Sequence, residues 1–226
     1  MQKTIIKHLG IIPDGNRRWA RRLGKKIGFG HKRGIESFRD VIEWCREINI
    51  SELTLYTLSI QNFQREKMEL DYLFYLIKKE LHHWLTTDEA QEKGIYVRAI
   101  GRKRMLPKDI ANDFKRLEEK TKNNKTLKVN FAIGYGGREE ILDAVKKTVK
   151  KKEKLTEENV RKNLWLSSYP ELVIRTSGEY RTSNFLMWQS AYSEWYFTKK
   201  CWPEFDKKEL LKAIRDFESR ERRYGK

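Results

Sequence analysis

The sequence is poor in cysteine and has no long apolar run. Its two cysteines, Cys45 and Cys201, lack the spacing of metal ligands. This count speaks against a disulfide framework and favours a reducing compartment. No stretch of 18 apolar residues occurs, so no segment is expected to cross a membrane. Residues 1–7 also lack the apolar stretch of a signal peptide. We therefore expect a cytoplasmic protein in which any membrane contact is peripheral.

Two glycine-rich phosphate motifs are missing as well. The pattern Gly-x-x-x-x-Gly-Lys-Ser/Thr is absent, which argues against nucleotide hydrolysis on such a loop. No Gly-x-Gly-x-x-Gly follows an expected strand, which argues against dinucleotide binding. A phosphate site in this chain must therefore be built differently.

Positive charge is what the sequence has in excess. It holds 49 Lys and Arg against 32 Asp and Glu, a net charge of +17. Such an excess favours a polyanionic partner: nucleic acid, an anionic membrane surface or a phosphorylated small molecule. Six lysines gather between Lys146 and Lys154, where we expect a solvated helix face. Because no nucleic-acid recognition motif accompanies the charge, we expect no nucleic-acid partner.

Short apolar runs alternate with helical periodicity, a pattern typical of an α/β fold with a mainly parallel sheet. Six strands are expected, at Leu9–Ile12, Leu53–Leu58, Ile95–Ile100, Leu127–Ile133, Leu172–Ile174 and Trp195–Phe197. Helices are expected over Lys32–Ile48, Met68–Leu85, Pro107–Thr121, Arg138–Lys152 and Lys208–Arg222. With no linker or repeat, residues 1–226 are expected to form a single domain. The apolar stripe of Met68–Leu85 either packs in the core or walls a cleft for an apolar ligand.

The stretch from His8 to Ala20 is the most informative in the chain. Its apolar run ends in Asp14-Gly-Asn, and from Asp14 to Arg33 there are eight Lys or Arg residues and one acid. A strand that feeds a tight loop and a helix start presents backbone N–H groups to an anion, and arginines add forked donors. The lone Asp14 among these cations suggests a bound metal ion.

A second cationic stretch follows the expected strand Leu172–Ile174. Arg175, Arg181 and Ser183 come after this strand, around the short Thr-Ser-Gly loop. In open α/β sheets ligands bind outside the carboxyl ends of the strands. Glu194 offers a further carboxylate. Two anion sites with carboxylates suggest two phosphorylated substrates and a divalent metal such as Mg²⁺.

Several motifs together resemble one family, the cis-prenyltransferases of the undecaprenyl diphosphate synthase type. The resemblance runs from His8 to the C-terminus. Its motifs are Asp14-Gly-Asn-Arg-Arg-Trp-Ala20, Gly30-His31-Lys32, Ser59…Asn62…Arg65, Tyr135-Gly-Gly-Arg138, Ile174-Arg-Thr-Ser-Gly-Glu179, Arg181…Ser183-Asn-Phe-Leu, Ala191-Tyr-Ser-Glu-Trp-Tyr-Phe197 and Arg220-Glu-Arg-Arg-Tyr-Gly225. The resemblance implies Mg²⁺-dependent condensation of isopentenyl diphosphate with an allylic prenyl diphosphate, farnesyl or geranylgeranyl diphosphate. It also implies an apolar tunnel for the growing chain and a homodimer, with peripheral membrane association through the lipid product.

The resemblance also implies roles for individual residues. Asp14, His31 and Asn62 are implied to be catalytic, and Asp14 and Glu194 to bind the metal. The implied substrate-binding residues are Gly15, Asn16, Arg17, Arg18, Trp19, Arg65, Arg175, Arg181, Ser183, Arg223 and Gly225. Among them Arg175, Arg181 and Ser183 are implied to hold isopentenyl diphosphate. Arg223 and Gly225 belong to a tail that reaches the partner subunit's active site in this family.

Several positions depart from the family pattern. Ile27 stands where the family usually has an arginine directed at the allylic diphosphate. Gln61 and Phe63 replace an acid and a tryptophan, and Glu66 replaces a proline. These departures keep two alternatives open. One is a variant prenyltransferase that uses another acceptor, such as an alcohol or a second prenyl unit. The other is a non-catalytic partner subunit, which the presence of Asp14, Arg175 and Arg181 disfavours.

Overall fold

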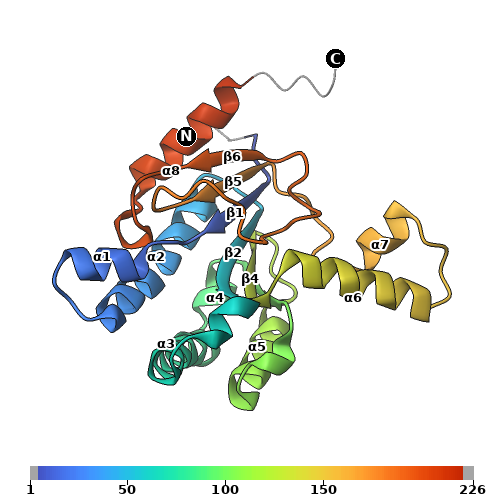
Figure 1. Ribbon diagram of the computed structural model, residues 1–226, viewed down its shortest axis with the longest axis horizontal. Helices are drawn as coiled ribbons and strands as arrows, with labels where there is room; N and C mark the ends of the chain where they lie inside the picture. The colour runs from blue at the N-terminus through green and yellow to red at the C-terminus, as the bar shows by residue number, and fades with distance from the viewer. Residues whose placement is uncertain (1–4, 221–226) are drawn as a thin grey trace.

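A six-stranded parallel sheet forms the centre of the molecule (Figure 1). The structure is a computed structural model and describes residues 5–220. The strand order is β3-β4-β2-β1-β5-β6, and all five neighbouring pairs are parallel. The strands are β1 (His8–Ile12), β2 (Glu52–Ser59), β3 (Ile95–Ile100), β4 (Leu127–Tyr135), β5 (Leu172–Arg175) and β6 (Glu194–Phe197). The predicted α/β class and all six predicted strands are confirmed.

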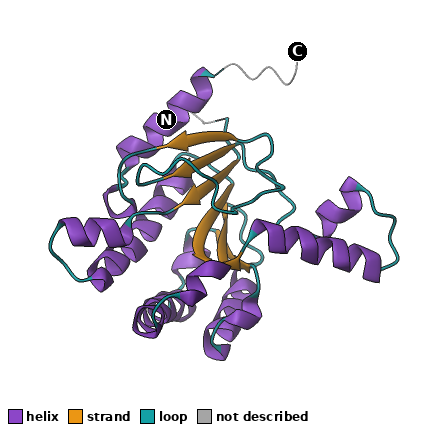
Figure 2. Cartoon of the chain, viewed as in Figure 1, coloured by secondary structure: helices purple, strands orange, loops and turns teal. Residues whose placement is uncertain are grey.

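Helices surround the strands in Figure 2. Those in residues 5–220 are α1 (Asn16–Arg22), α2 (Ile27–Glu47), α3 (Lys67–Thr86), α4 (Glu89–Glu92), α5 (Lys108–Thr121), α6 (Gly137–Lys150), α7 (Glu157–Asn163) and α8 (Lys207–Ser219). Three short 3₁₀ turns join them: η1 (Ile60–Gln64), η2 (Lys103–Met105) and η3 (Trp202–Glu204). The five predicted helices are present. The sequence indicated the start of α1 but not the short helices α4 and α7.

The first turn of α2 precedes the predicted helix start at Lys32. Gly28, Gly30 and Gly34 lower the helix propensity of this segment and conceal its beginning. Two of them are needed for packing. A Cβ on Gly30 would lie 2.1 Å from the backbone oxygen of Asn16, and one on Gly34 would lie 2.5 Å from Asn16 Oδ1. These glycines let α1 lie directly against α2.

Alternate strand residues face two separate cores, as the two-residue period of a strand requires. Leu9 and Ile11 of β1 belong to the larger core, which α2, α3, α5 and α8 cover. Ile12 belongs to a smaller core on the other face. Strands buried on both faces are the reason why the sequence shows continuous apolar runs rather than alternation. No helix within residues 5–220 combines the length and apolar character needed to cross a bilayer.

Candidate active site

A cavity of about 790 Å³ opens at the carboxyl ends of β1, β2 and β5. β1 has β2 on one side and β5 on the other, so the chain's connections diverge at this edge, where open α/β sheets bind ligands. Ten of the predicted site residues line the cavity: Asp14, Gly15, Asn16, Arg17, Arg18, His31, Asn62, Arg65, Arg175 and Ser183. The two cationic stretches of the sequence therefore meet in one place.

The turn after β1 fixes Asp14 at the cavity. Its backbone N–H donates to Thr176 Oγ1 over 2.8 Å, and Thr176 Oγ1 donates to the Asp14 carbonyl over 2.7 Å. The next residue, Gly15, has φ of 105°. A Cβ there would lie 2.7 Å from Ser177 Cβ and 2.9 Å from Cys201 Cβ. Only glycine can adopt this positive φ and fit beside Ser177 and Cys201, which explains why glycine follows Asp14.

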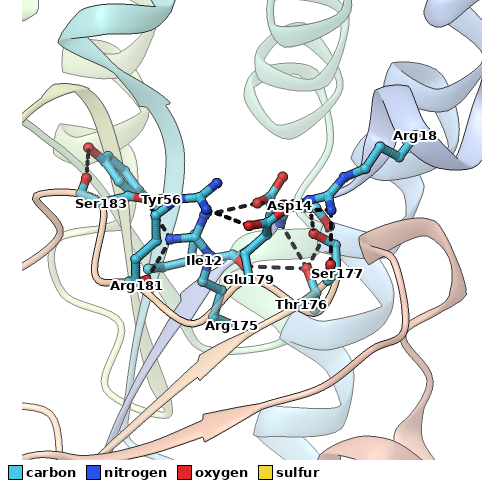
Figure 3. Close-up of polar contacts among 10 residues, drawn as sticks. All are labelled: Ile12, Asp14, Arg18, Tyr56, Arg175, Thr176, Ser177, Glu179, Arg181 and Ser183. Carbon is cyan, nitrogen blue, oxygen red and sulfur yellow. Dashed lines mark hydrogen bonds and ion pairs between the residues drawn. The ribbon is translucent and has the colours of Figure 1, made fainter.

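Arg175 ends β5 and organises the centre of the site (Figure 3). It is only 3% exposed. Its Nη2 donates to Asp14 Oδ2 over 2.9 Å, and its Nη1 donates to Ser183 Oγ over 2.5 Å and to the Arg181 carbonyl over 2.6 Å. Its Nε is buried without a hydrogen-bond partner among the described residues. A buried guanidinium with an unused donor is well suited to meet an anionic ligand.

The backbone that carries Ser183 is strained. Ser183, Asn184 and Leu186 have positive φ values of 50°, 64° and 46°. None is glycine, and such conformations cost free energy that the surrounding structure must offset. Tyr56 OH donates to the Ser183 carbonyl over 3.3 Å and helps to hold the loop. The strain presents Ser183 Oγ to Arg175.

Glu179 bridges the two cationic stretches. One of its carboxylate oxygens accepts from Arg18 Nη1 over 2.7 Å, and the other accepts from Arg181 Nη1. Arg18 also contacts Asp14, with Nη2 3.2 Å from Asp14 Oδ2, and donates to Ser177. The pairing with both arginines keeps the pKa of Glu179 below its usual value. A diphosphate that binds Arg18 must compete with these acids.

Glu69, a residue that sequence reasoning missed, gathers two arginines and a histidine beside the cavity. Its Oε1 lies 3.0 Å from His31 Nε2 and 3.2 Å from Arg65 Nη1, and its Oε2 lies 3.9 Å from Arg17 Nε. Only 10% of its side chain is exposed. Burial lowers the pKa of His31, and Glu69 opposes this shift. Glu69 lies four residues after Arg65, and this spacing is typical of an ion pair on a helix. The spacing does not predict the contact between Glu69 and His31.

Asn62 lies at the same cavity in η1. Its Oδ1 accepts from the Ser59 N–H over 3.1 Å, and Ser59 Oγ accepts from the Asn62 N–H over 3.2 Å. This reciprocal cap fixes the side-chain amide, because its oxygen is occupied. Within residues 5–220 the Nδ2 group donates no hydrogen bond, so it is available as a donor to a ligand in the cavity.

The cavity is strongly cationic. Residues 5–220 contribute five arginines to its lining (Arg17, Arg18, Arg21, Arg65 and Arg175) and one acid, Asp14. No group of three or more potential metal ligands occurs within the described residues. Mg²⁺, however, is commonly held by one or two carboxylates together with substrate phosphates and water. A single carboxylate beside a phosphate-binding arginine cluster fits that mode of binding.

An apolar extension leads from the cationic cavity between α2 and α3. Ile35, Phe38, Leu73 and Ile77 line the first cavity, and a further apolar pocket of about 60 Å³ begins at Ile35, Phe38 and Ile77. This pocket continues to Leu81, Trp84, Phe114 and Leu117. The apolar stripe predicted on Met68–Leu85 therefore both packs in the core and forms a wall of the apolar pocket.

Some predicted site residues lie elsewhere. The Trp19 ring stacks on Phe29 at 5.3 Å and does not line the cavity, because α1 turns it outward. Arg181 contributes its carbonyl to Arg175, while its side chain pairs with Glu179 and is also outside the cavity lining. Arg223 and Gly225 lie outside the described residues.

Within one chain the structure does not bring together Glu194 and Asp14, the two residues predicted to bind the metal. Glu194 begins β6 and is in register with Leu172, the first residue of β5, whereas Asp14 follows the last residue of β1. The two carboxylates therefore lie at opposite ends of the parallel strands. Glu194 instead accepts a hydrogen bond from Arg220 Nη1 over 2.6 Å.

The positions that depart from the family pattern are scattered around the site. Ile27 opens α2 outside the cavity lining, while Arg17 and Arg21 on α1 face the cavity. Gln61 lines the cavity, and Phe63 packs against Phe74 of α3 at 6.1 Å. The described cavity lining therefore has no arginine from α2 and three from α1, because Arg18 also belongs to α1.

Comparison with known proteins points to one family. The model of a prenyltransferase family, described as "Putative undecaprenyl diphosphate synthase", matches residues 12–225. A protein of Methanocaldococcus jannaschii named tritrans,polycis-undecaprenyl-diphosphate synthase (geranylgeranyl-diphosphate specific) is 44% identical over 99% of this chain and 84% of its own length.

Two solved structures share the fold along essentially the whole chain. Lavandulyl diphosphate synthase from Lavandula x intermedia, in complex with dimethylallyl diphosphate, superposes with a TM-score of 0.91 at 32% identity, over 98% of both chains. A "probable undecaprenyl diphosphate synthase" from Campylobacter jejuni superposes with a TM-score of 0.84 at 36% identity, over 100% of both chains.

Proposed function

The chain belongs to the undecaprenyl diphosphate synthase family of cis-prenyltransferases, and on this basis we propose that it condenses isopentenyl diphosphate with geranylgeranyl diphosphate. The name of the relative from Methanocaldococcus jannaschii supports this donor. The observation that carries the proposal is the convergence of two arginine sets around Asp14, with an apolar pocket leading away. Such a site matches two diphosphates, with an apolar entrance between α2 and α3 for the hydrocarbon chain.

The two substrates have distinct places in the proposal. The allylic diphosphate lies against the Gly15 turn, Asn16, Arg17 and Arg18, with Arg65 beside it. Isopentenyl diphosphate lies against Arg175 and Ser183, with Arg181 released from Glu179 to join them. Backbone N–H groups at the start of α1 add to the anion site, although α1 is short. The hydrocarbon tail extends toward Ile77 and Leu81.

In the reaction the allylic C–O bond breaks and diphosphate leaves with the electron pair. The double bond of isopentenyl diphosphate attacks the allylic carbon, and loss of a proton forms the new cis double bond. Arg18 and Arg65 stabilise the negative charge on the leaving diphosphate, which is their main contribution to rate. His31 and Asn62 orient that group from the same cavity wall. Bound Mg²⁺, held by Asp14 and the phosphates, would supply further charge neutralisation.

The chain is proposed to act as a homodimer. Exposed apolar side chains gather on α6 and on residues 187–192 beside it: Leu142 (56% exposed), Val149 (62%) and Met187 (39%). An apolar depression lined by Ile141, Val145 and Trp188 lies next to them. Large exposed apolar surface of this kind is typical of an oligomer interface. Light scattering after size exclusion tests it: a monomeric mass would contradict the proposal.

The purified chain tests the reaction directly. With labelled isopentenyl diphosphate, geranylgeranyl diphosphate and Mg²⁺, label is expected in longer prenyl diphosphates, and a chelator should abolish it. Asp14→Asn is the matched variant, because it keeps the shape and removes the charge. Turnover by the chain alone would exclude a non-catalytic partner role. Full activity of Asp14→Asn would contradict the proposed metal site.

A second candidate is transfer of the prenyl group to another acceptor. The similarity to lavandulyl diphosphate synthase favours it, because a protein with this fold makes a different prenyl diphosphate. A panel of alcohols and of prenyl diphosphates, followed by mass spectrometry, separates the two candidates. Products elongated only by isopentenyl units would reject the second.

A further inference from the structure

The first turns of α3 carry an apolar stripe that faces away from the core. Met68, Tyr72 and Tyr75 follow one another at steps of four and three residues, which places them on one side of the helix. Met68 is 84% exposed and Tyr75 60% exposed, and the rings of Tyr72 and Tyr75 stack at 6.1 Å. Leu73 and Ile77 on the opposite side are buried. Helix α3 therefore has an outer apolar stripe in addition to the one that walls the pocket.

The turn between α1 and α2 extends this stripe. Leu23 is 48% exposed and Phe29 is 45% exposed, and Phe29 stacks on Trp19. The two segments meet at Gly28, where an added Cβ would lie 3.0 Å from the ring of Tyr72. In Figure 1, α1, the beginning of α2 and α3 lie on the side of the molecule away from α6 and α7. We call this surface the docking face; its apolar members are Trp19, Leu23, Phe29, Met68, Tyr72 and Tyr75.

Uncompensated positive charge borders the docking face. Residues 15–35 contain eight Lys or Arg and no acid. Lys25, Lys26 and Lys32 are exposed, and none of them forms a salt bridge within residues 5–220. Lys32 follows Phe29 by three residues on α2, so the two lie on the same side of that helix. On α3 the adjacent acid, Asp71, is paired with Lys67 over 2.5 Å.

We propose that the docking face binds an anionic lipid surface. Exposed aromatic and aliphatic side chains flanked by lysines are the arrangement that seats a protein at the boundary of headgroups and acyl chains. Lysines add attraction to anionic headgroups. A second copy of the chain is a poor occupant, because a symmetric contact through this face would bring the unpaired Lys25, Lys26 and Lys32 of both copies together. The exposed side chains of Leu23 and Met68 cannot donate hydrogen bonds to the phosphates or bases of a nucleic acid. A lipid surface is therefore a better occupant than RNA or DNA.

The inference rests on this surface and not on the proposed reaction. If both hold, the entrance of the cationic cavity lies next to the membrane, since α1, α2 and α3 carry residues of the docking face and of the cavity lining. A prenyl product too apolar for water could then pass directly into lipid.

Vesicle flotation with the full chain tests the proposal. Wild type is expected to float with phosphatidylcholine/phosphatidylglycerol vesicles and not with phosphatidylcholine alone, and high salt should weaken the binding. The variant Lys25→Glu/Lys26→Glu should lower the partition coefficient at least about 25-fold, since each lysine near an anionic surface contributes about fivefold. The variant Leu23→Ser/Met68→Ser should lower it about tenfold through lost apolar burial.

Matched controls come from the opposite edge of the sheet. Lys7→Glu/Lys125→Glu makes the same charge change at exposed positions before β1 and β4, and Ile5→Ser removes an apolar side chain that is 67% exposed. These controls should bind vesicles as wild type does, and Leu23→Ser/Met68→Ser should keep wild-type thermal stability. Equal binding to neutral and anionic vesicles would overturn the proposal, and so would an equal loss of vesicle binding in the control variants. It would also be overturned if RNA bound to this face and the docking-face variants abolished RNA binding while vesicle binding persisted.

Discussion

Arg175 Nη2 donates to Asp14 Oδ2 over 2.9 Å and thereby joins the carboxyl ends of β5 and β1 into one site. The two residues are 161 positions apart in the chain. They meet because β1 and β5 are neighbours in the sheet, with Ile12 in register with Arg175. This contact places Asp14, the only acid that residues 5–220 contribute to the cavity lining, against the proposed isopentenyl diphosphate site.

Replacement of Arg175 by lysine should be severe although the charge is kept. Lysine has no planar fork, so it cannot hold Asp14, Ser183 and the Arg181 carbonyl together. Loss of two charge-assisted hydrogen bonds of about 1.5 kcal/mol each corresponds to a decrease of kcat/KM for isopentenyl diphosphate of about 100-fold. Steady-state kinetics measure this. The control Arg98→Lys, on β3 beside Glu118, should retain wild-type rates.

Two glycines with positive φ should respond differently to alanine. Gly15→Ala forces a Cβ to 2.7 Å from Ser177 Cβ, so it should lower the free energy of unfolding by about 3 kcal/mol and abolish turnover. Gly24→Ala meets nothing within 4 Å and should cost about 1 kcal/mol with turnover retained. Urea denaturation and activity assays distinguish them. Equal decreases in the free energy of unfolding and in turnover for the two variants would mean that the close contact at Gly15 is unimportant.

Glu69 is predicted to position His31 and Arg65. Glu69→Gln should lower the pKa of His31 further, because burial already lowers it and the hydrogen bond and charge of Glu69 oppose that shift. The same variant should reduce kcat/KM for the allylic substrate about tenfold, consistent with the loss of one charge-assisted hydrogen bond. NMR titration of the imidazole and kinetics give the two readouts. Glu80→Gln, also on α3 and paired with Arg39, is the control. An unchanged His31 titration would contradict the role.

His8 should make stability depend on pH. It is 3% exposed, its Nε2 lies 2.8 Å from Thr54 Oγ1, and burial lowers its pKa from 6.5 although the charges of Glu52 and Glu171 oppose the shift. Below about pH 6.5 the unfolded chain takes up a proton that the folded chain does not. Stability is therefore lost as the pH falls from 6.5 toward the lowered folded pKa, with a slope approaching about 1.4 kcal/mol per pH unit.

The variant His8→Gln isolates this contribution. Its free energy of unfolding, measured in urea between pH 5.5 and 7.5, should have a shallower dependence on pH than that of wild type. The difference between the two proteins removes the contributions of all other groups. Parallel curves would show that His8 does not contribute.

Much of the fold could be predicted because parallel strands buried on both faces leave continuous apolar runs. The carboxyl ends of Leu9–Ile12 and Leu172–Ile174 also identified where the site lies. Glu194 lies at the opposite edge because it is the first residue of a parallel strand, whereas ligands bind outside the carboxyl ends. Glu69 and Glu179 could not be identified in the same way. Each has one partner far away in the sequence, His31 for Glu69 and Arg18 for Glu179. Only the packing of α3 against α2 and of the 177–183 loop against α1 brings these pairs together.

The most direct test of the central claim is the structure of the product. The purified chain is incubated with geranylgeranyl diphosphate, isopentenyl diphosphate and Mg²⁺, and the products are analysed by mass spectrometry for chain length and by NMR for double-bond geometry. We predict a series of prenyl diphosphates, each longer by one isopentenyl unit, with every new double bond cis. Trans double bonds, or a donor that is coupled to another acceptor without elongation, would contradict the assignment.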